Sequence, residues 1–171
     1  DNPVPMPYTM HYNRKEQGIV ADYVIIMGYD EHYAGSEKAG TVASLSFERN
    51  GIQETLKEVP AEKIISGVPF YTRLWNTDAQ GGVTSEAFGM DTAEQWLSDN
   101  GVTANWSQET SQDYAELEAS DGSKYQIWLE NEKSLEEKAK LVKEYNLGGI
   151  AAWKLGFERS SIWDVLYKYV S

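Results

Sequence analysis

Three short apolar runs separated by helix-like segments constrain the fold of this chain more than any other feature. The runs occupy residues 23–29, 64–71 and 149–153. Continuous runs rich in β-branched and aromatic residues are typical of strands buried on both faces, as in parallel sheets. Because helical patterns alternate with these runs, we predict an α/β fold built from βαβ units with right-handed crossovers.

Helix signals fill the intervals between the runs. Asn13 is a candidate N-cap for a short first helix, and Ser134 with Glu137 forms a capping-box pattern. A closed (β/α)₈ barrel needs eight strands and about 250 residues, so three strands are too few for one. We therefore predict half of such a barrel, with a small open doubly wound sheet as the alternative. The longer helices are predicted at residues 44–58, 134–145 and 160–169.

The stretch between the second and third runs has a different character, because polar segments dotted with aromatic residues replace the apolar runs. A short helix is predicted at residues 91–98, with Asp91 as its cap. The turn sequence Ser120-Asp-Gly-Ser123 between two strand-like segments indicates a hairpin. The predicted organisation is a partial barrel from residues 1–75 and 131–171, with a small α+β insertion at residues 76–130.

Composition narrows the classes of partner. The chain has 171 residues with 27 acidic and 15 basic side chains, a formal net charge of -12. Phosphate backbones select basic proteins, so we expect no nucleic-acid partner. The chain has no cysteine, two histidines and no apolar run of about 18 residues, so we expect no disulfide, metal site, cofactor or membrane span. A neutral sugar polymer is not disfavoured, and the many aromatic residues suit either stacking on sugars or the core.

Strand parity predicts a ligand-binding rim. Side chains two positions apart share one face of a strand, and the active site of a barrel lies at the C-terminal ends of its strands. Each run has one set that ends there in an aromatic or charged residue, although core aromatics without a ligand are the alternative. Asp30 and Glu31 face opposite ways, so one of them is expected to be a loop cap or a solvent carboxylate. The three sets are Ile25, Met27 and Tyr29; Gly67, Pro69, Tyr71 and Arg73; and Gly149, Ala151 and Trp153.

Three motifs resemble the sixth, seventh and eighth barrel strands of glycoside hydrolase family 18. They are Met27-Gly-Tyr-Asp30, Gly67-Val-Pro-Phe-Tyr-Thr-Arg73 and Gly148-Gly-Ile-Ala-Ala-Trp153. The longer stretches at residues 27–36 and 128–134 are similar to the bacterial spore-cortex and cell-wall branch. The resemblance implies the C-terminal half of a (β/α)₈ barrel, with an insertion between strand seven and its helix. It also implies a location outside the cell, in the cell envelope or in the spore coat of a bacterium.

The resemblance implies hydrolysis of β-1,4-linked glycans that contain N-acetylglucosamine, either chitin or peptidoglycan and cortex. In this family the 2-acetamido oxygen of the sugar attacks the anomeric carbon, and a Glu protonates the leaving oxygen. By resemblance, Tyr29 hydrogen-bonds the acetamido group, and Asp30 holds the substrate and polarises the site. The implied substrate-binding residues are Met27, Tyr71, Arg73, Glu130 and Trp153.

The sequence departs from the family at one point. The family acid ends a D-x-x-D-x-D-x-E signature, and no segment here has that spacing. General acid–base groups typically contribute about 10²–10⁴-fold. We therefore expect sugar-binding subsites but no measurable glycosidase activity from this chain alone. Open sheet edges also favour pairing with another chain, so we expect self-association.

Two alternatives to an enzyme fragment stay open on the sequence. The first is a catalytically dead, lectin-like sugar-binding member of the family, which would share every residue present here. The second is a complete small α/β domain with an unrelated role. The residue at the last position of the acid signature separates the first alternative from an enzyme, because a Glu there indicates catalysis.

Overall fold

A computed structural model describes residues 13–170 of the chain. Its first sheet contains three parallel strands in the order β1 (Val24–Met27), β2 (Ile64–Pro69) and β8 (Gly149–Trp153). Met27 pairs with Gly67, and Pro69 pairs with Trp153. All three predicted strands are therefore present, and their C-terminal ends lie at one edge of one sheet.

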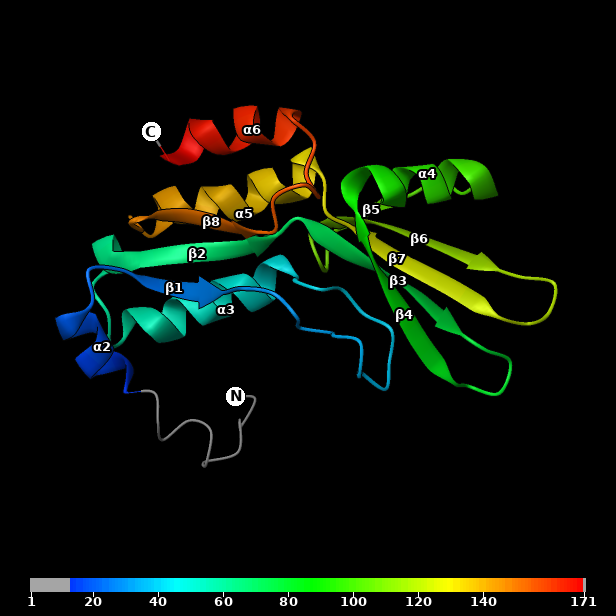
Figure 1. Cartoon of the computed structure of the whole chain (residues 1–171), viewed down its shortest axis with the longest axis horizontal. Helices are drawn as coiled ribbons and strands as arrows, with labels where there is room; N and C mark the ends of the chain where they lie inside the picture. The colour runs from blue at the N-terminus through cyan, green and yellow to red at the C-terminus, as the bar shows by residue number, and fades with distance from the viewer. Residues whose placement is uncertain (1–12, 171) are drawn as a thin grey trace.

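Helices follow the strands in the order that the sequence predicts (Figure 1). Asn13 caps α2 by accepting a hydrogen bond from the backbone of Glu16, and Ser44 caps α3 in the same way through Phe47. A short 3₁₀ helix leads into β2. The predicted helices thus form with small shifts of their ends. Their bounds are Arg14–Val20 for α2, Leu45–Leu56 for α3, Ala61–Lys63 for the 3₁₀ helix, Glu132–Glu144 for α5 and Ser161–Val170 for α6.

The chain leaves β2 at Phe70 and continues directly into a second, antiparallel sheet, as Figure 1 shows. This sheet has five strands in the order β4-β3-β7-β6-β5, and α4 (Met90–Asn100) packs on it. The predicted hairpin is present as β6 and β7. The division of the chain between residues 75 and 76 stays a prediction, and β3 crosses it. The strands are Tyr71–Thr77 (β3), Val83–Gly89 (β4), Asn105–Ser107 (β5), Gln112–Glu118 (β6) and Lys124–Leu129 (β7).

Two predicted helix starts are wrong. Gly89, not Asp91, is the N-cap of α4, and it makes no side-chain cap hydrogen bond. In α5 the capping box joins Asn131 and Ser134, so the helix begins at Glu132 rather than at Ser134. An Asn side chain caps as well as a Ser does, and the sequence offered both signals three residues apart. The strand β4, which pairs along the whole of β3, was not predicted.

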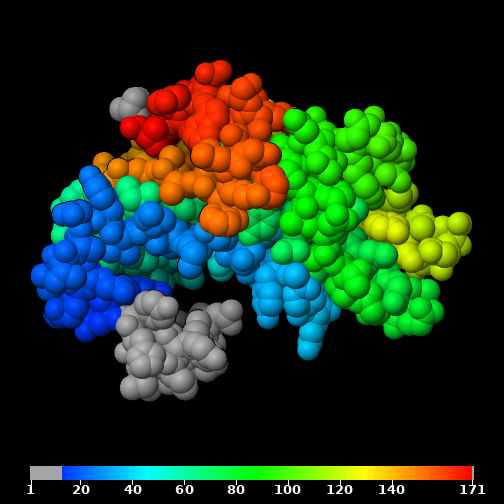
Figure 2. Space-filling model, viewed as in Figure 1, coloured from blue at the N-terminus to red at the C-terminus, as the bar shows by residue number. Residues whose placement is uncertain are grey.

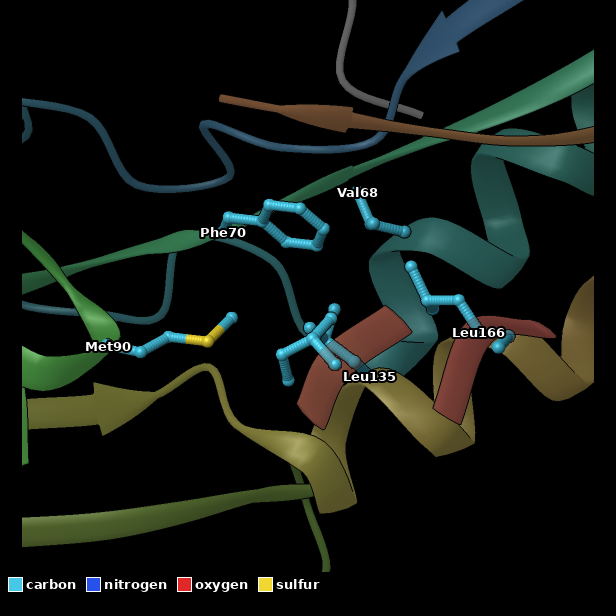
Figure 3. Close-up of a cluster of buried hydrophobic side chains, with 7 residues drawn as sticks. Val68, Phe70, Met90, Leu135 and Leu166 are labelled. Carbon is cyan, nitrogen blue, oxygen red and sulfur yellow. The ribbon is translucent and has the colours of Figure 1, made fainter. Parts of the chain in front are cut away.

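The main core lies between the first sheet and its helices (Figure 3). Val68 and Phe70 come from β2 and its end, Leu135 from α5 and Leu166 from α6. Met90 reaches this cluster from the first turn of α4, which ties the second sheet to the first. A separate apolar cluster under α4 contains Ala93, Leu97, Ala115, Ile127 and Leu129.

One face of the first sheet is open among the described residues. Ile25 is 61% exposed and Met27 is 71% exposed, whereas Ile150 and Ala152 on the other face pack against the main core. This asymmetry is what part of a (β/α)₈ barrel would have, because its inner face is normally covered by the other strands. Within residues 13–170, no helix combines the length and the apolar character needed to cross a membrane.

Candidate functional site

Tyr29, Asp30 and Tyr71 meet at the carboxyl edge of the first sheet. The Tyr71 hydroxyl donates a hydrogen bond to Asp30 Oδ1 at 2.5 Å. The rings of Tyr29 and Tyr71 stand edge to face, with centroids 6.3 Å apart. Two strands that are distant in sequence thus bring together two phenols and a carboxylate, which can hold a polar ligand by directional hydrogen bonds.

Burial and charge keep both phenols protonated. Burial raises the pKa of Tyr29, and the nearby Asp30 carboxylate raises it further. Burial also raises the pKa of Tyr71, followed by its hydrogen bond to Asp30 and the charge of that residue. A phenol with a raised pKa remains a hydrogen-bond donor at neutral pH. The Tyr71 hydroxyl donates its hydrogen bond to Asp30, whereas the Tyr29 hydroxyl has no hydrogen-bond partner among the described residues.

Close backbone approach sets the position of Tyr29. The amide of Gly28 donates to the Gly67 carbonyl at 2.9 Å. A Cβ on Gly28 would lie 2.7 Å from that same oxygen, a separation that real Cβ atoms essentially never show. Glycine at position 28 therefore lets the chain after β1 stay against β2. Asp30 follows with φ of 63°, a left-handed conformation that Asp tolerates better than most residues.

Glu31 is a loop cap, which is one of the two roles expected for one member of the Asp30–Glu31 pair. Its Oε2 accepts a hydrogen bond from the backbone amide of Ser44 at 2.7 Å, beside the N-terminus of α3. A carboxylate is favoured there because the free amides of a helix start carry partial positive charge. Asp30 and Glu31 thus point to different partners, and only Asp30 joins the two tyrosines.

Trp153 and Met27 lie at the same edge. Trp153 is the last residue of β8, and 56% of its surface is exposed. Its backbone oxygen accepts a hydrogen bond from the Phe70 amide at 2.7 Å. Met27 ends β1. Figure 2 shows the segment after β8, in orange, exposed between the blue N-terminal elements and the green part of the second sheet. A large exposed indole at the same sheet edge as the two tyrosines offers a flat apolar surface to a ligand.

Arg73 lies further along, in the second sheet. Its Nη1 donates to Ser85 Oγ on β4 at 3.2 Å, and its Nε is buried without a hydrogen-bond partner among the described residues. An arginine has five N–H donors, so this geometry leaves donors for a ligand. Arg73 is two residues after Tyr71 on β3, so the two side chains lie on the same face of that strand.

Glu130 is not brought to the edge. Its carboxylate is buried and makes only protein contacts, with Lys138 Nζ and Gln112 Nε2 at Oε1 and with Ser134 Oγ at Oε2. Those contacts occupy the lone pairs that a sugar hydroxyl would use. Glu130 therefore joins the end of β7 to α5 through Lys138 and does not face the sheet edge.

A buried network around Glu130 was not predicted from the sequence. Lys138 Nζ lies 2.5 Å from Glu130 Oε1 and 3.1 Å from Glu48 Oε1, and all three side chains are at most 1% exposed. Thr41 extends the network, because its hydroxyl donates to Gln112 Oε1 at 2.5 Å. In sequence, Lys138 and Glu48 look like ordinary polar positions of amphipathic helices. The network joins α3, α5, β6 and the end of β7.

No cluster of His, Asp and Glu suited to a metal ion is found in the part of the chain that the structure describes.

The chain is similar to known proteins in family, in sequence and in structure. The model of glycosyl hydrolases family 18 matches residues 4–158. YdhD of Bacillus subtilis strain 168, which carries the name of a sporulation-specific glycosylase, is 33% identical over 150 residues, or 88% of this chain and 36% of that protein. The cortical fragment-lytic enzyme of the same organism is 27% identical over 91% of this chain and 36% of its own length.

A solved structure shows the same fold. A chitinase of Chromobacterium violaceum ATCC 12472 superposes with a TM-score of 0.83 at 28% identity, over 94% of this chain and 49% of that one. The predicted half barrel is therefore confirmed. The chain spans 36% of the length of these curated relatives, so it corresponds to a part of each.

Proposed function

Because the chain belongs to glycosyl hydrolase family 18, we propose that it is part of a glycosidase acting on β-1,4-linked glycans that contain N-acetylglucosamine. The observation that carries this proposal is the meeting of Tyr29, Asp30 and Tyr71 beside the exposed Trp153 at one sheet edge. Sugar recognition needs an aromatic face for the ring and directional hydrogen bonds for its substituents, and this edge supplies both.

Each residue has a role in substrate-assisted cleavage with retention. Tyr29 donates its free hydroxyl proton to the 2-acetamido group and holds that group in line with the anomeric carbon. Asp30, fixed by Tyr71, supplies negative charge beside the acetamido nitrogen as positive charge develops there. Trp153 carries the reacting sugar ring, and Met27 lines the floor. Arg73 contacts a neighbouring sugar, while Glu130 supports the insertion from behind.

The glycan that we favour is bacterial cortex or cell-wall peptidoglycan. Two relatives are named for sporulation and for lysis of cortical fragments. We accordingly propose a place in the cell envelope or the spore coat, or outside the cell. Chitin is the other substrate with the same amino sugar, and the matched chitinase makes a chitin oligomer a suitable probe of the shared sugar.

Binding of chitotetraose tests the proposal. The chain is expected to bind it, and Trp153→Ala is expected to weaken binding about tenfold. Losing an aromatic contact costs about 1.4 kcal/mol, and that free energy corresponds to a factor of ten in affinity. Isothermal titration measures both. Tyr167→Ala is the matched control, because Tyr167 is an exposed aromatic residue on α6, away from the ends of the strands. Equal affinity of the wild type and Trp153→Ala would contradict the proposed platform.

The same material tests for catalysis. No sugar release from chitotetraose is expected from this chain, because no D-x-x-D-x-D-x-E segment supplies a general acid. Reducing-end assays or mass spectrometry detect release. Turnover by the pure chain would show that another group protonates the leaving oxygen.

We also propose that the chain self-associates through the open face and edges of the first sheet. Ile25 and Met27 leave apolar surface exposed on β1, which is an edge strand. Light scattering is expected to show a mass that rises with concentration, and Ile25→Glu is expected to lower it by placing a charge on that face. A monomer at all concentrations would rule this out.

A further inference from the structure

A cleft of about 440 Å³ lies where the segment after β1 meets the second sheet. One wall is the loop at residues 39–41 and the start of α3, and the other is formed by β5, β6 and β7. Its volume falls within the range of about 300–1,000 Å³ that is typical of small-molecule sites. Neither the family match nor the roles proposed above assign anything to it.

Two aromatic rings form the apolar part of the cleft. Tyr114 on β6 and Trp128 on β7 pair across the strands, with ring centroids 4.7 Å apart and planes at 43°. The Tyr114 hydroxyl is held by Gln126 Nε2 at 2.7 Å and by Glu116. Because both ends of the Tyr114 side chain are fixed, the pair presents a rigid surface at little entropic cost to a ligand.

The polar part of the cleft has hydrogen-bonding capacity that the protein leaves unused. Thr110 Oγ1 is buried and has no partner among the described residues, although hydroxyls removed from water normally have one. Ser107 Oγ accepts only a long bond, 3.4 Å, from the Thr110 amide. Glu109 is exposed at the rim of the cleft. Hydroxyl and carboxylate groups of this kind recognise the hydroxyls of a ligand.

The charge of the lining selects the class of ligand. Among the described residues, Glu31, Glu109 and His32 line the cleft, and no Lys or Arg does. Anionic ligands are therefore disfavoured by like charge. A purely apolar ligand would leave the Thr110 hydroxyl unsatisfied. A neutral ring with several hydroxyls fits both the aromatic pair and the open polar groups.

The cleft is separate from the Tyr29 edge. Asp30 turns to Tyr71, while Glu31 turns to Ser44 and lines the cleft. The loop between is anchored, because the buried Trp75 Nε1 donates to the Gly40 carbonyl at 2.7 Å. None of the residues given a role at the Tyr29 edge lines the cleft.

We propose that this cleft is a second saccharide-binding site, which holds one neutral sugar unit against Trp128 and Tyr114 and hydrogen-bonds it through Thr110 and Glu109. Such a site would bind a second sugar unit of the same polymer. Two linked contacts bind a long glycan more tightly than either alone, provided that the chain can reach both. The inference does not need catalysis at the other edge.

Amide and indole NMR spectra of the labelled chain, titrated with chitotetraose in the Trp153→Ala background, test the site. That background weakens the other edge, so the remaining shifts are expected at the Trp128 indole N–H and the Thr110 amide. Thr110→Val is then expected to lower affinity at least threefold. It removes a hydroxyl without a protein partner, so folding should be kept. Thr103→Val, at an exposed threonine outside the cleft, is the control and should bind as the background does.

Two outcomes would overturn the second site: no shift at Trp128 or Thr110, or unchanged affinity in Thr110→Val. Shifts near Tyr29 in the wild type with none in the cleft would leave the proposed function standing and refute only this inference. Cleft shifts in both backgrounds with no response near Tyr29 would refute the proposed function alone.

Discussion

Replacement of Lys138 by methionine is expected to destabilise the chain by about 3–5 kcal/mol, the usual cost of removing one partner from a buried ion pair. The Lys138 side chain is 1% exposed, and its Nζ is 2.5 Å from Glu130 Oε1. Methionine fills a similar volume but leaves the Glu130 carboxylate without a counter-charge. Gln112 and Ser134 still donate to Glu130, yet neutral donors do not replace a cation.

Urea unfolding of the wild type and of Lys138→Met measures this loss. Lys140→Met is the matched control in the same helix, because Lys140 pairs with Glu137 at 2.5 Å but is exposed. Exposed pairs contribute about 0–1 kcal/mol, so the control should unfold close to the wild type. The double variant Lys138→Met with Glu130→Gln should regain part of the loss, since it removes the stranded charge. A loss in Lys138→Met no larger than in the control would contradict a charged buried pair.

Stability is expected to fall as pH rises from about 4.5 to about 8, because of Glu48. Burial raises the pKa of Glu48 from 4.5 to about 8; Lys138 opposes that shift and Glu130 adds to it. In this window the folded chain keeps the Glu48 proton while the unfolded chain has lost it. The unfolded state thus binds fewer protons, and the free energy of unfolding decreases with pH. At roughly 1.4 kcal/mol per pKa unit, the difference amounts to several kcal/mol.

The Glu48→Gln variant isolates this effect. Glutamine has nearly the same size and keeps an oxygen in the place of Glu48 Oε1, which lies 3.1 Å from Lys138 Nζ, but it does not titrate. The free energy of unfolding of the variant should therefore change less with pH, and the variant should be the more stable protein above about pH 8. Glu54→Gln, at an exposed pair with Lys57, is the control and should follow the wild-type curve. Parallel curves for the wild type and Glu48→Gln would mean that Glu48 is ionised in the folded chain.

The same network explains why Glu130 does not reach the ligand edge. One lysine faces two buried glutamates, so a single positive charge compensates one negative charge, and the other carboxyl holds its proton. Glu130 has the shorter contact with Lys138 and also accepts from Gln112 and Ser134; these contacts oppose the rise in its pKa that burial causes. This arrangement joins the insertion to α5 and α3.

Local patterns in the sequence predicted most of the elements. The apolar runs identified β1, β2 and β8, and the turn at Ser120–Ser123 identified the β6–β7 hairpin. The start of α5 was predicted too late, at Ser134, because both Asn131 and Ser134 are residue types that cap helices. Which of them becomes the cap depends on where the preceding strand ends. β4 was missed because its residues, Val83–Gly89, are half exposed and lack an apolar run. Such a strand is stabilised by pairing with β3, which is not a local property.

What the sequence by itself determined is the parallel α/β order, the family resemblance and the edge on which Tyr29, Tyr71 and Trp153 lie, because strand periodicity and strand direction are local and additive. Tertiary structure alone decided that Asp30 turns to Tyr71 while Glu31 caps α3, that Glu130 is buried with Lys138 and Glu48, and that Thr110 faces a cleft. These outcomes depend on burial and on which charges meet across segments far apart in the chain. The free energy of a buried charge is set by those neighbours and not by its own stretch of sequence.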